Sequence, residues 1–326
     1  MTFYIFKMKS AVLFVIFKRP DTTRRVFERI REAQPPRLYI AADGPRKDRP
    51  DEAEKCSLTR QIVENIDWPC EVHRLYRDEN LGCGKGVSSA ITWFFEHEEQ
   101  GIIIEDDILP HIDFFKYCDE MLERYKDDER IQLIGGRNYF FDGYNSNVSY
   151  FLSSYGHIWG WASWRRVWDT YEFDVNNIPK DVYLERLYKR LPIKAAKFFK
   201  KIYELMQNRM VDTWDYQFAV NRFYFERYSI LPFVNMIENI GFDSTDATHT
   251  TGNNRREIEY RASSPYPLTH PLILVVDPKL EKICMRNSGS YIKPIYWRFL
   301  SRFYRFFCRL FVFLFINHGR NYKEIK

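Results

Sequence analysis

Residues 101–107 have the sequence Gly-Ile-Ile-Ile-Glu-Asp-Asp, in which three β-branched residues lead directly into three carboxylates. The isoleucine run predicts a short buried strand, so that Glu105, Asp106 and Asp107 stand at its carboxyl end. Adjacent carboxylates repel one another unless a cation lies among them. Mg²⁺ and Mn²⁺ prefer such oxygen ligands, and the segment therefore predicts a divalent metal site. The alternative is a solvated acidic turn that precedes a helix capped by Asp113.

On both sides of this segment, apolar runs of strand length alternate with amphipathic stretches. Strands are expected at residues 11–17, 37–42, 70–76, 101–104 and 131–134. Helices are expected at residues 21–33 (capped by Asp21), 52–66, 90–95 and 114–125. Such alternation with short connections predicts an α/β fold, a mostly parallel sheet that helices flank.

After Gly136 the pattern changes. Residues 137–154 suggest loops and short antiparallel strands, residues 180–210 a basic helical stretch, and residues 231–239 one late strand. The chain is expected to divide into a ligand-binding half at residues 1–136, a second half of the same domain at 137–275, and a basic tail at 276–326.

Polar side chains follow each predicted strand of the first half. In open α/β sheets, ligands bind at the carboxyl ends of the strands. Lys18 and Arg19 follow the first strand, Asp43 follows the second, and Lys85 lies in a turn that contains three glycines after the third. Beside the acidic segment, this mixture suits a diphosphate held through a divalent metal. The simpler alternatives are a turn-initiating role for Asp43 and an exposed loop position for Lys85.

Charge and cysteine content exclude several classes of protein. The 326 residues carry a net charge of +5, and residues 282–326 hold ten of the 49 Lys and Arg but one of the 44 Asp and Glu. The rest of the chain therefore has 39 basic residues against 43 acidic ones, a charge of −4, which does not suit a simple nucleic-acid-binding protein. The six cysteines show no CxxC or Cys-His spacing, so neither a zinc site nor a disulfide scaffold is expected, and a reducing compartment is favoured.

The N-terminal sequence has some features of a signal peptide, because Lys7 and Lys9 precede the apolar run at residues 11–17. That run is short and no small-residue cleavage site follows it, so a first buried strand is the favoured interpretation. The sequence contains no uncharged apolar stretch of the length that a transmembrane helix needs.

Several segments resemble one known family. IIIEDDILPHIDFF, preceded by NLGCGKGVSSAITWFFE, resembles the metal-binding segment of GT-A-fold glycosyltransferases, and is most similar to the N-acetylglucosaminyltransferase I type, which also carries Glu-Asp-Asp. VIFKRPDTTRRVF and YIAADG resemble the nucleotide-binding half of that family. GHIWGWASWRRVWDTY and DTWDYQF resemble its acceptor-side segment and Trp-Asp base region, and VNMIENIGFDSTDATHTT resembles a closing segment of bacterial members. The resemblance covers about residues 10–255 and implies a GT-A-like fold.

The resemblance implies roles for individual residues on the donor side. Arg19 and Asp43 match positions that hold the nucleotide, Glu105 and Asp106 match contacts to the donor sugar and ribose, and Asp107 matches the metal ligand. Lys85 lies among glycines that let the backbone approach a phosphate. His249 matches a histidine that many such enzymes place on the metal or diphosphate, and neutral imidazole suits Mn²⁺. A solvated loop histidine is the alternative.

Inverting transfer of a sugar needs a general base for the attacking hydroxyl. The family pattern points to Asp215, with Asp212 as the second candidate. The family carries two adjacent acids, whereas these two are three residues apart, a spacing that would put both on one face of a helix. One of them could instead cap that helix. Trp159, Trp161 and Trp164 offer flat faces for stacking on sugars, or else belong to the core.

The tail predicts a contact with a membrane surface. Arg298, Arg302, Arg305 and Arg309 follow one another in steps of four, three and four, which places them along one face of a helix that Trp and Phe residues otherwise fill. A basic amphipathic helix with an aromatic face is typical of segments that lie in a membrane interface. Docking of this helix on the core of the protein is the alternative.

Together these features predict a metal-dependent inverting glycosyltransferase that uses Mn²⁺ or Mg²⁺ and a nucleotide-diphosphate sugar, with UDP as the expected nucleotide. The expected acceptor is a glycan or lipid-linked glycan of surface polysaccharide synthesis, and the expected location is the inner face of the cell membrane. One alternative is a sugar-1-phosphate nucleotidyltransferase, although the glycines usual after its first strand are replaced here by Lys18-Arg19-Pro20-Asp21. The other is a membrane-associated adaptor without catalytic activity.

Overall fold

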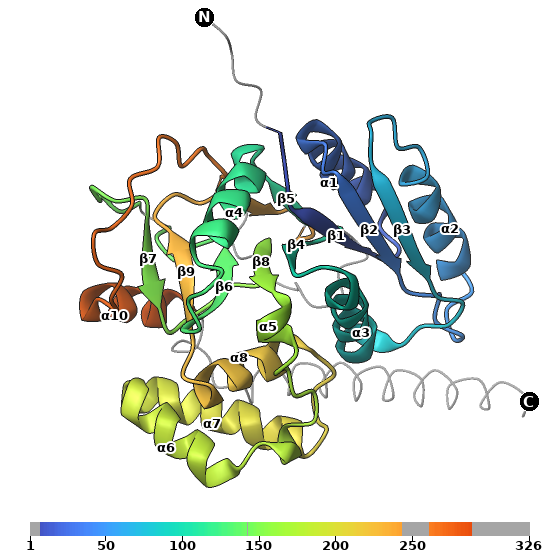
Figure 1. The fold of residues 1–326 in the computed structure, drawn as a ribbon. Helices are drawn as coiled ribbons and strands as arrows, with labels where there is room; N and C mark the ends of the chain where they lie inside the picture. Colours follow the sequence, from blue (N-terminus) through green and yellow to red (C-terminus); the bar gives the residue numbers. More distant parts are fainter. Residues whose placement is uncertain (1–6, 142, 243–260, 289–326) are drawn as a thin grey trace, which may run out of the picture.

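The computed structural model describes residues 7–141, 143–242 and 261–288. Its centre is an eight-stranded sheet with the strand order β3-β2-β1-β4-β8-β6-β9-β7 (Figure 1). The strands are β1 (Ala11–Ile16), β2 (Arg37–Ala42), β3 (Glu71–Tyr76), β4 (Gln100–Glu105), β6 (Ile131–Gly135), β7 (Tyr150–Ser153), β8 (Trp161–Trp164) and β9 (Tyr228–Pro232). All run in one direction except β7 and β8, which pair antiparallel with their neighbours.

Helices lie on both sides of this sheet. They are α1 (Pro20–Ala33), α2 (Glu52–Ile62), α3 (Gly82–His97), α4 (Asp113–Arg124), α5 (Arg165–Trp168), α6 (Lys180–Arg190), α7 (Ile193–Gln207), α8 (Asp215–Tyr224) and α10 (Pro278–Asn287). The helices α6, α7 and α8 pack on one another below the sheet in the view of Figure 1. The predicted α/β class, with a mostly parallel sheet flanked by helices, is therefore confirmed, and the arrangement is consistent with a GT-A-like fold.

The central strands are continuous apolar runs because both of their faces are covered. The residues of β1 from Ala11 to Phe14, and Ile102–Ile104 of β4, are almost completely buried. A strand buried on both faces has no polar alternation, and this is why the sequence alone identifies these strands. Their shared direction brings the residues after β1, β2, β3, β4 and β6 to one edge of the sheet, here named the carboxyl edge.

Three local predictions are wrong. Asp21 does not cap the first helix, because α1 begins at Pro20 with Arg19 at its N-cap. The three glycines after β3 do not form a turn before α3 but are its first residues, starting at Gly82. The late strand predicted at residues 231–239 is two strands, β9 and β10 (Ile237–Asn239). They are separated at Asn235, whose side-chain amide donates to the Ile237 carbonyl. The strand β10 pairs antiparallel with β5 (Ile108–Pro110) in a small separate sheet.

The second part of the chain has a core of its own. The basic stretch predicted as helical forms α6 and α7, separated at Leu191 and Pro192. Their apolar sides pack with α8 and with Leu280 and Cys284 of α10. Residues 278–287, at the start of the predicted tail, are thus a helix on the folded body. Residues 289–326 of the tail, which include the predicted stripe of four arginines, lie outside the described residues.

Two further features concern the described residues only. The five cysteines among them, Cys56, Cys70, Cys83, Cys118 and Cys284, all carry free thiols. None of the helices in the described ranges combines the length and the apolar character that crossing a bilayer requires.

Candidate active site at the carboxyl edge of the sheet

The acidic segment is held in place by the loop that follows β1. The strands β1 and β4 are neighbours, with Val15 opposite Glu105. The Phe17 amide donates to Asp106 Oδ2 at 3.1 Å. The Arg19 guanidinium donates through Nη1 to Asp106 Oδ1 at 3.1 Å and to Asp107 Oδ2 at 2.7 Å. The sheet thus brings together Arg19, Glu105, Asp106 and Asp107, as their positions after two adjacent parallel strands predict.

The carboxylates of this segment are buried, and this changes how they hold protons. Burial raises the pKa of Glu105 to about 8, with the charges of Asp107, Asp106 and Asp215 adding to the rise. Burial also raises the pKa of Asp106 to about 6, while Arg19 opposes the rise. One oxygen of Glu105, Oε1, is buried without a hydrogen-bond partner among the described residues. An acidic, partly unsatisfied cluster of this kind favours a bound cation.

The small sheet of β5 and β10 closes against the same segment. Ile240 donates its amide to the Asp107 carbonyl at 2.9 Å. Gly241 lies so close that a Cβ atom there would be 2.4 Å from Asp107 Oδ2, so a larger residue would displace the Asp107 carboxylate. The described chain ends at Phe242 in this region, and His249 lies outside the described residues.

Asp43 follows β2 and contacts the start of α3. Its two carboxylate oxygens accept hydrogen bonds from the Leu81 amide at 3.0 and 3.1 Å. A Cβ atom on Gly86, one turn further along, would meet Asp43 Oδ2 at 3.1 Å. Burial raises the pKa of Asp43, although the backbone bond from Leu81 opposes the rise. Asp43 is therefore a half-buried acid that tethers the loop before α3, at the edge where the sequence predicts a nucleotide.

Asp212 reaches the same helix end from the second half of the chain. Its Oδ1 accepts from the Gly84 amide at 2.9 Å and its Oδ2 from the Cys83 amide at 3.2 Å. Gly82 has a φ of +80°, and a Cβ atom there or on Gly84 would lie 2.7 or 2.6 Å from the Asp212 carboxylate. Glycine is therefore required at both positions, and Asp212 satisfies two amides that a helix start leaves without partners.

Asp212 and Asp215 do not share a helix face, contrary to the prediction. The helix α8 begins at Asp215, and Asp212 precedes it. Asp215 accepts a short hydrogen bond from the Thr213 hydroxyl. Its charge contributes to the raised pKa values of Glu105, Cys83 and Tyr171, which places it beside the acidic segment. The structure thus brings Asp215 to the carboxyl edge and gives Asp212 a capping contact with α3.

A buried aromatic cluster fixes the segment that carries Asp215. Trp214 is 2% exposed and stacks on Trp161 with ring centroids 5.7 Å apart. The Tyr171 hydroxyl donates to the Trp214 carbonyl at 3.0 Å. Trp161 and Trp164 are themselves buried, so for both of them the core alternative holds and not the stacking on sugars.

Trp159 differs from these two tryptophans because it is only half-buried. It lies edge-on to Phe242 at 5.9 Å and against His157 at 4.5 Å, with the Arg137 guanidinium 4.8 Å from its ring. Phe242 directly follows Gly241, which contacts Asp107. Of the three predicted tryptophans, Trp159 is therefore the one that lies near the site with part of its ring accessible.

The remaining cations at this edge differ in their surroundings. Lys18 is 7% exposed and pairs with the buried Glu52 at 2.7 Å, so its charge is used within the fold. Lys85 is exposed on the first turn of α3, and within the described ranges no hydrogen bond or ion pair of its side chain is seen. Cys83 is a site residue that no pattern in the sequence singles out. Burial raises the pKa of its thiol, with Glu105, Asp215 and Asp212 adding to the rise.

The oxygen donors at this edge fit a divalent cation. The Arg19 guanidinium contacts both Asp106 and Asp107. The buried Glu105 Oε1 lacks a partner in the described part of the chain. Mg²⁺ is usually bound by one or two carboxylates together with phosphate oxygens and water. Within the described ranges, no three His, Cys, Asp or Glu side chains form a complete metal site. An ion here would therefore need ligands from a bound phosphate or from residues outside those ranges.

Comparison with known proteins gives limited similarity. No family model matches the sequence, and no curated protein matches it. HddC from Yersinia pseudotuberculosis is similar with a TM-score of 0.32 and 13% identity, over 49% of this chain and 79% of HddC. The glycosyltransferase GlyE of Streptococcus pneumoniae TIGR4 is similar with a TM-score of 0.34 and 9% identity, over 69% of this chain and 45% of GlyE. The chain thus spans less than half of the length of GlyE, and at such TM-scores neither likeness assigns a function.

Proposed function

We propose that this protein is a metal-dependent inverting glycosyltransferase that uses a nucleotide-diphosphate sugar, with UDP as the nucleotide. The acceptor would be a glycan or lipid-linked glycan of surface polysaccharide synthesis. One observation carries the proposal: a buried cluster of Glu105, Asp106 and Asp107 at the carboxyl edge, with Asp215 from the second half of the chain beside it. Such a transfer requires carboxylates in two roles: one group binds a cation and another accepts a proton.

On the donor side, the acidic segment would hold a Mn²⁺ or Mg²⁺ ion through Asp107 and a neighbouring carboxylate. When bound, the ion neutralises charge on the departing nucleoside diphosphate. Arg19 keeps Asp106 and Asp107 oriented, and Asp43 and Glu105 would contact the nucleotide and sugar. Within the same proposal, Lys85 would contact the diphosphate.

His249 completes the proposed donor side. It would serve as a further ligand of the metal or diphosphate, because the described chain that leads toward it contacts Asp107 through Gly241.

Asp215 would act as the general base. Its carboxylate is oriented by the Thr213 hydroxyl, and Trp214 anchors the segment in the core. Asp212 is a poorer candidate because both of its oxygens already accept amides of α3. A general base must keep an oxygen available for the hydroxyl proton of the acceptor. Asp212 would then position the segment that carries Asp215, whereas Asp215 would take the proton.

Attachment to the inner face of the cell membrane through residues 295–316 belongs to the same proposal. Four arginines spaced along one helical face favour anionic headgroups, and the aromatic residues between them favour the interface. This placement would bring the site near lipid-linked acceptors.

Turnover of nucleotide sugars tests the proposal directly. Incubation of the full chain with a panel of nucleotide-diphosphate sugars and Mn²⁺ should release nucleoside diphosphate slowly, by hydrolysis, and chelation should stop the release. Release of inorganic pyrophosphate from a nucleoside triphosphate and a sugar-1-phosphate would instead identify a nucleotidyltransferase. Binding of nucleotide sugar without turnover, even with acceptor extracts, would favour the adaptor.

A further inference from the structure

We infer that the folded body carries its own membrane-docking face, formed by the segment before α10 and by the exposed side of α10. This docking face consists of Leu272, Ile273, Val275, Lys279, Lys282 and Arg286, and its partner is an anionic lipid bilayer. The inference is independent of the proposed transfer reaction, because no residue of the docking face belongs to the carboxyl edge.

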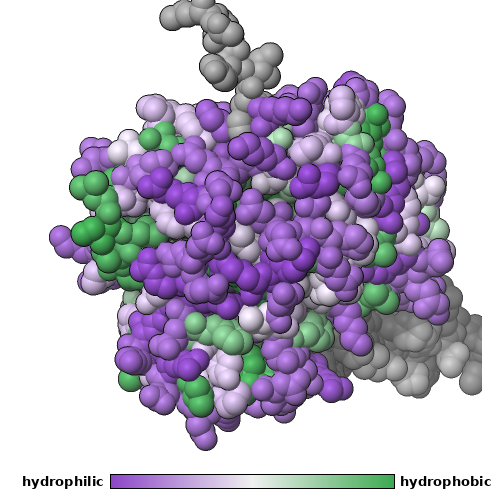
Figure 2. Space-filling view, in the orientation of Figure 1, coloured by the Kyte–Doolittle hydropathy of each residue, from purple (hydrophilic) through white to green (hydrophobic). Residues whose placement is uncertain are grey.

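The apolar part of the docking face is the most exposed apolar segment in the described part of the chain. Leu272 is 104% exposed, Ile273 is 74% exposed and Val275 is 62% exposed. Leu274 and Val276 pack on the core, and Val276 bridges to Leu152 of β7, so the backbone of the segment is anchored while three of its apolar side chains stay exposed. Figure 2 shows an apolar patch at the left edge of the molecule, where the segment before α10 runs in Figure 1.

The charged part lies on α10 directly after this segment. Lys279, Lys282 and Arg286 are exposed and follow one another in steps of three and four, so they share one face of the helix. Glu281 faces inward, where its carboxylate accepts from the Ser153 hydroxyl at 2.6 Å and from the Ser154 amide at 3.1 Å. The exposed side of α10 is therefore cationic.

The start of α7 carries further exposed cationic side chains. Arg190, the last residue of α6, donates to the Ser154 hydroxyl at 2.9 Å, and Ser154 in turn contacts Glu281 of α10. This chain of bonds links the end of α6 to α10 through Ser154. The exposed residues that follow are Ile193, Lys194 and Lys197. The start of α7 thus also exposes an apolar side chain next to cationic ones.

A lipid bilayer fits this combination better than a soluble polyanion does. Exposed aliphatic side chains gain by entering the interface between headgroups and acyl chains, whereas a polyanion offers them nothing to contact. Cations beside them gain from anionic headgroups. In addition, the chain leaves α10 directly into residues 289–326, whose sequence is basic and aromatic, so the two membrane-binding elements would start at the same place.

Flotation of the full chain with vesicles tests this inference. One variant combines Leu272→Asn, Ile273→Asn and Val275→Asn, and its control is Leu58→Asn, an exposed leucine on α2. A second variant combines Lys279→Gln, Lys282→Gln and Arg286→Gln, and its control combines Arg24→Gln, Arg25→Gln and Arg29→Gln on α1. The vesicles are phosphatidylcholine with or without phosphatidylglycerol. Melting temperature and circular dichroism show whether each variant is folded.

The apolar variant should lose about tenfold in partitioning to vesicles that contain phosphatidylglycerol. The charge variant should lose more than about tenfold on these vesicles at low salt, since each basic residue near an anionic surface strengthens binding about fivefold. Both controls should bind as the unchanged chain does. Equal flotation of all variants would overturn the inference and leave binding to the tail alone. Unchanged flotation together with a concentration-dependent dimer that the apolar variant abolishes would overturn it in favour of a second copy of the chain.

Discussion

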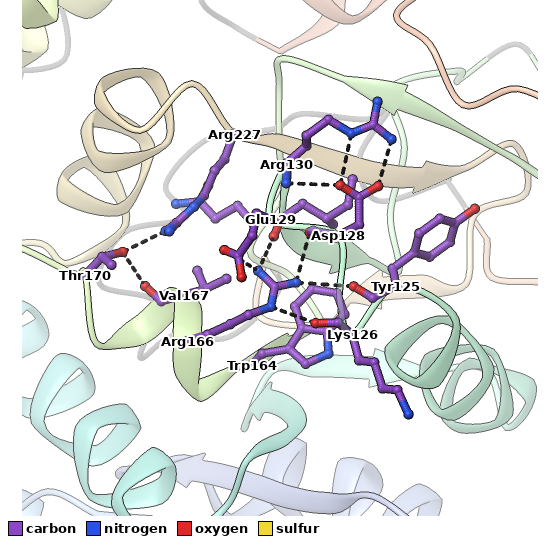
Figure 3. Close-up of polar contacts among 12 residues, drawn as sticks. Tyr125, Lys126, Asp128, Glu129, Arg130, Trp164, Arg166, Val167, Thr170 and Arg227 are labelled. Atoms are coloured by element: carbon purple, nitrogen blue, oxygen red, sulfur yellow. Dashed lines mark hydrogen bonds and ion pairs between the residues drawn. The ribbon is translucent and has the colours of Figure 1, made fainter.

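Arginine and carboxylate side chains lie at both edges of the sheet, but the two edges differ in how far their polar groups find partners within the fold. At the carboxyl edge, Arg19 faces Glu105, Asp106 and Asp107, and one buried oxygen of Glu105 stays without a partner in the described residues. At the opposite edge, Arg166 from α5 donates to four backbone carbonyls at and after the end of α4, those of Tyr125, Lys126, Asp128 and Ile131 (Figure 3).

The neighbours of Arg166 in Figure 3 are paired as well. Asp128 accepts two bonds from the Arg130 guanidinium, at 2.9 and 2.7 Å, and Arg227 donates to the Thr170 hydroxyl at 2.7 Å. Polar groups that are satisfied within the fold stabilise it, whereas buried groups left partly unsatisfied are typical of sites that take a ligand. We therefore call the edge around Arg166 the structural edge and the carboxyl edge the functional edge.

The largest expected effect is that of Asp215→Asn on catalysis. The amide cannot take a proton, so the transfer rate should fall by roughly 10²–10⁴-fold, the usual contribution of a general base, while donor affinity stays unchanged. Steady-state kinetics with the identified donor, together with calorimetry of UDP binding, would measure both. A loss of donor binding in this variant would assign Asp215 to the donor side instead.

Glu52→Gln should have the next largest effect, on stability and its pH dependence. Glu52 is buried; burial alone would raise its pKa, but hydrogen bonds from Arg46 and Lys18 lower the pKa from the ordinary 4.5 to about 2. A group with a lowered folded-state pKa contributes stability above pH 4.5 and loses it as the pH falls toward 2. Removing one partner of such a buried pair costs about 3 kcal/mol near neutral pH.

Urea unfolding of the native chain and of Glu52→Gln between neutral pH and pH 2 measures this effect. The difference between the two should shrink below pH 4.5. Glu64→Gln is the control, because Glu64 pairs with Arg74 at the surface and should contribute less than about 1 kcal/mol. A difference that stays constant down to pH 2 would show that the charge of Glu52 is not what stabilises the fold.

Arg166→Met tests the structural edge. The variant removes one donor from each of four carbonyls at and after the end of α4, and should lower the free energy of unfolding by about 2 kcal/mol. UDP binding should not change, because the carboxyl edge is at the other end of the strands. Arg130→Met, which removes an exposed pair, should cost less than about 1 kcal/mol. Weaker UDP binding by Arg166→Met would contradict the separation of the two edges.

The smallest expected effect is that of Asp212→Ala. Loss of the cap on α3 should cost about 1 kcal/mol of stability. The transfer rate should fall far less than in Asp215→Asn, and Asp212→Asn, whose single amide oxygen can still accept one of the two backbone amides, should restore part of both. Chemical unfolding and kinetics of the pair of variants would measure this. A rate loss in Asp212→Asn as large as that in Asp215→Asn would make Asp212 the base.

The functional edge is predictable from the sequence in part, for identifiable reasons. The residues of β1 and β4 are continuous apolar runs, and the polar residues that follow parallel strands must meet at one edge. These two facts are enough to place Arg19 and Asp107 together. The start of α3 is not predictable locally, because glycine is unfavourable in a helix. Its partner Asp212 lies 128 residues away in sequence, and only the fold brings it there.

The aromatic residues show the same limit of prediction from the sequence. The sequence does not distinguish Trp161, buried in the core, from Trp159, half-buried near Phe242, although one glycine separates them. Burial depends on whether a side chain faces α8 or the carboxyl edge, which is a property of the assembled sheet. Asn235, where the late strand is interrupted, also donates to the Arg261 carbonyl at 3.1 Å, a contact with a residue distant in sequence.

The central claim is that the acidic segment holds a divalent cation for a nucleoside diphosphate. Titration calorimetry of UDP with and without Mn²⁺ tests it most directly, on the native chain, on Asp107→Ala and on the control Asp113→Ala, a partly exposed acid at the start of α4. We predict Mn²⁺-dependent binding of UDP by the native chain and by Asp113→Ala, and its loss in Asp107→Ala. Unchanged Mn²⁺-dependent binding of UDP by Asp107→Ala would contradict the assignment of the site.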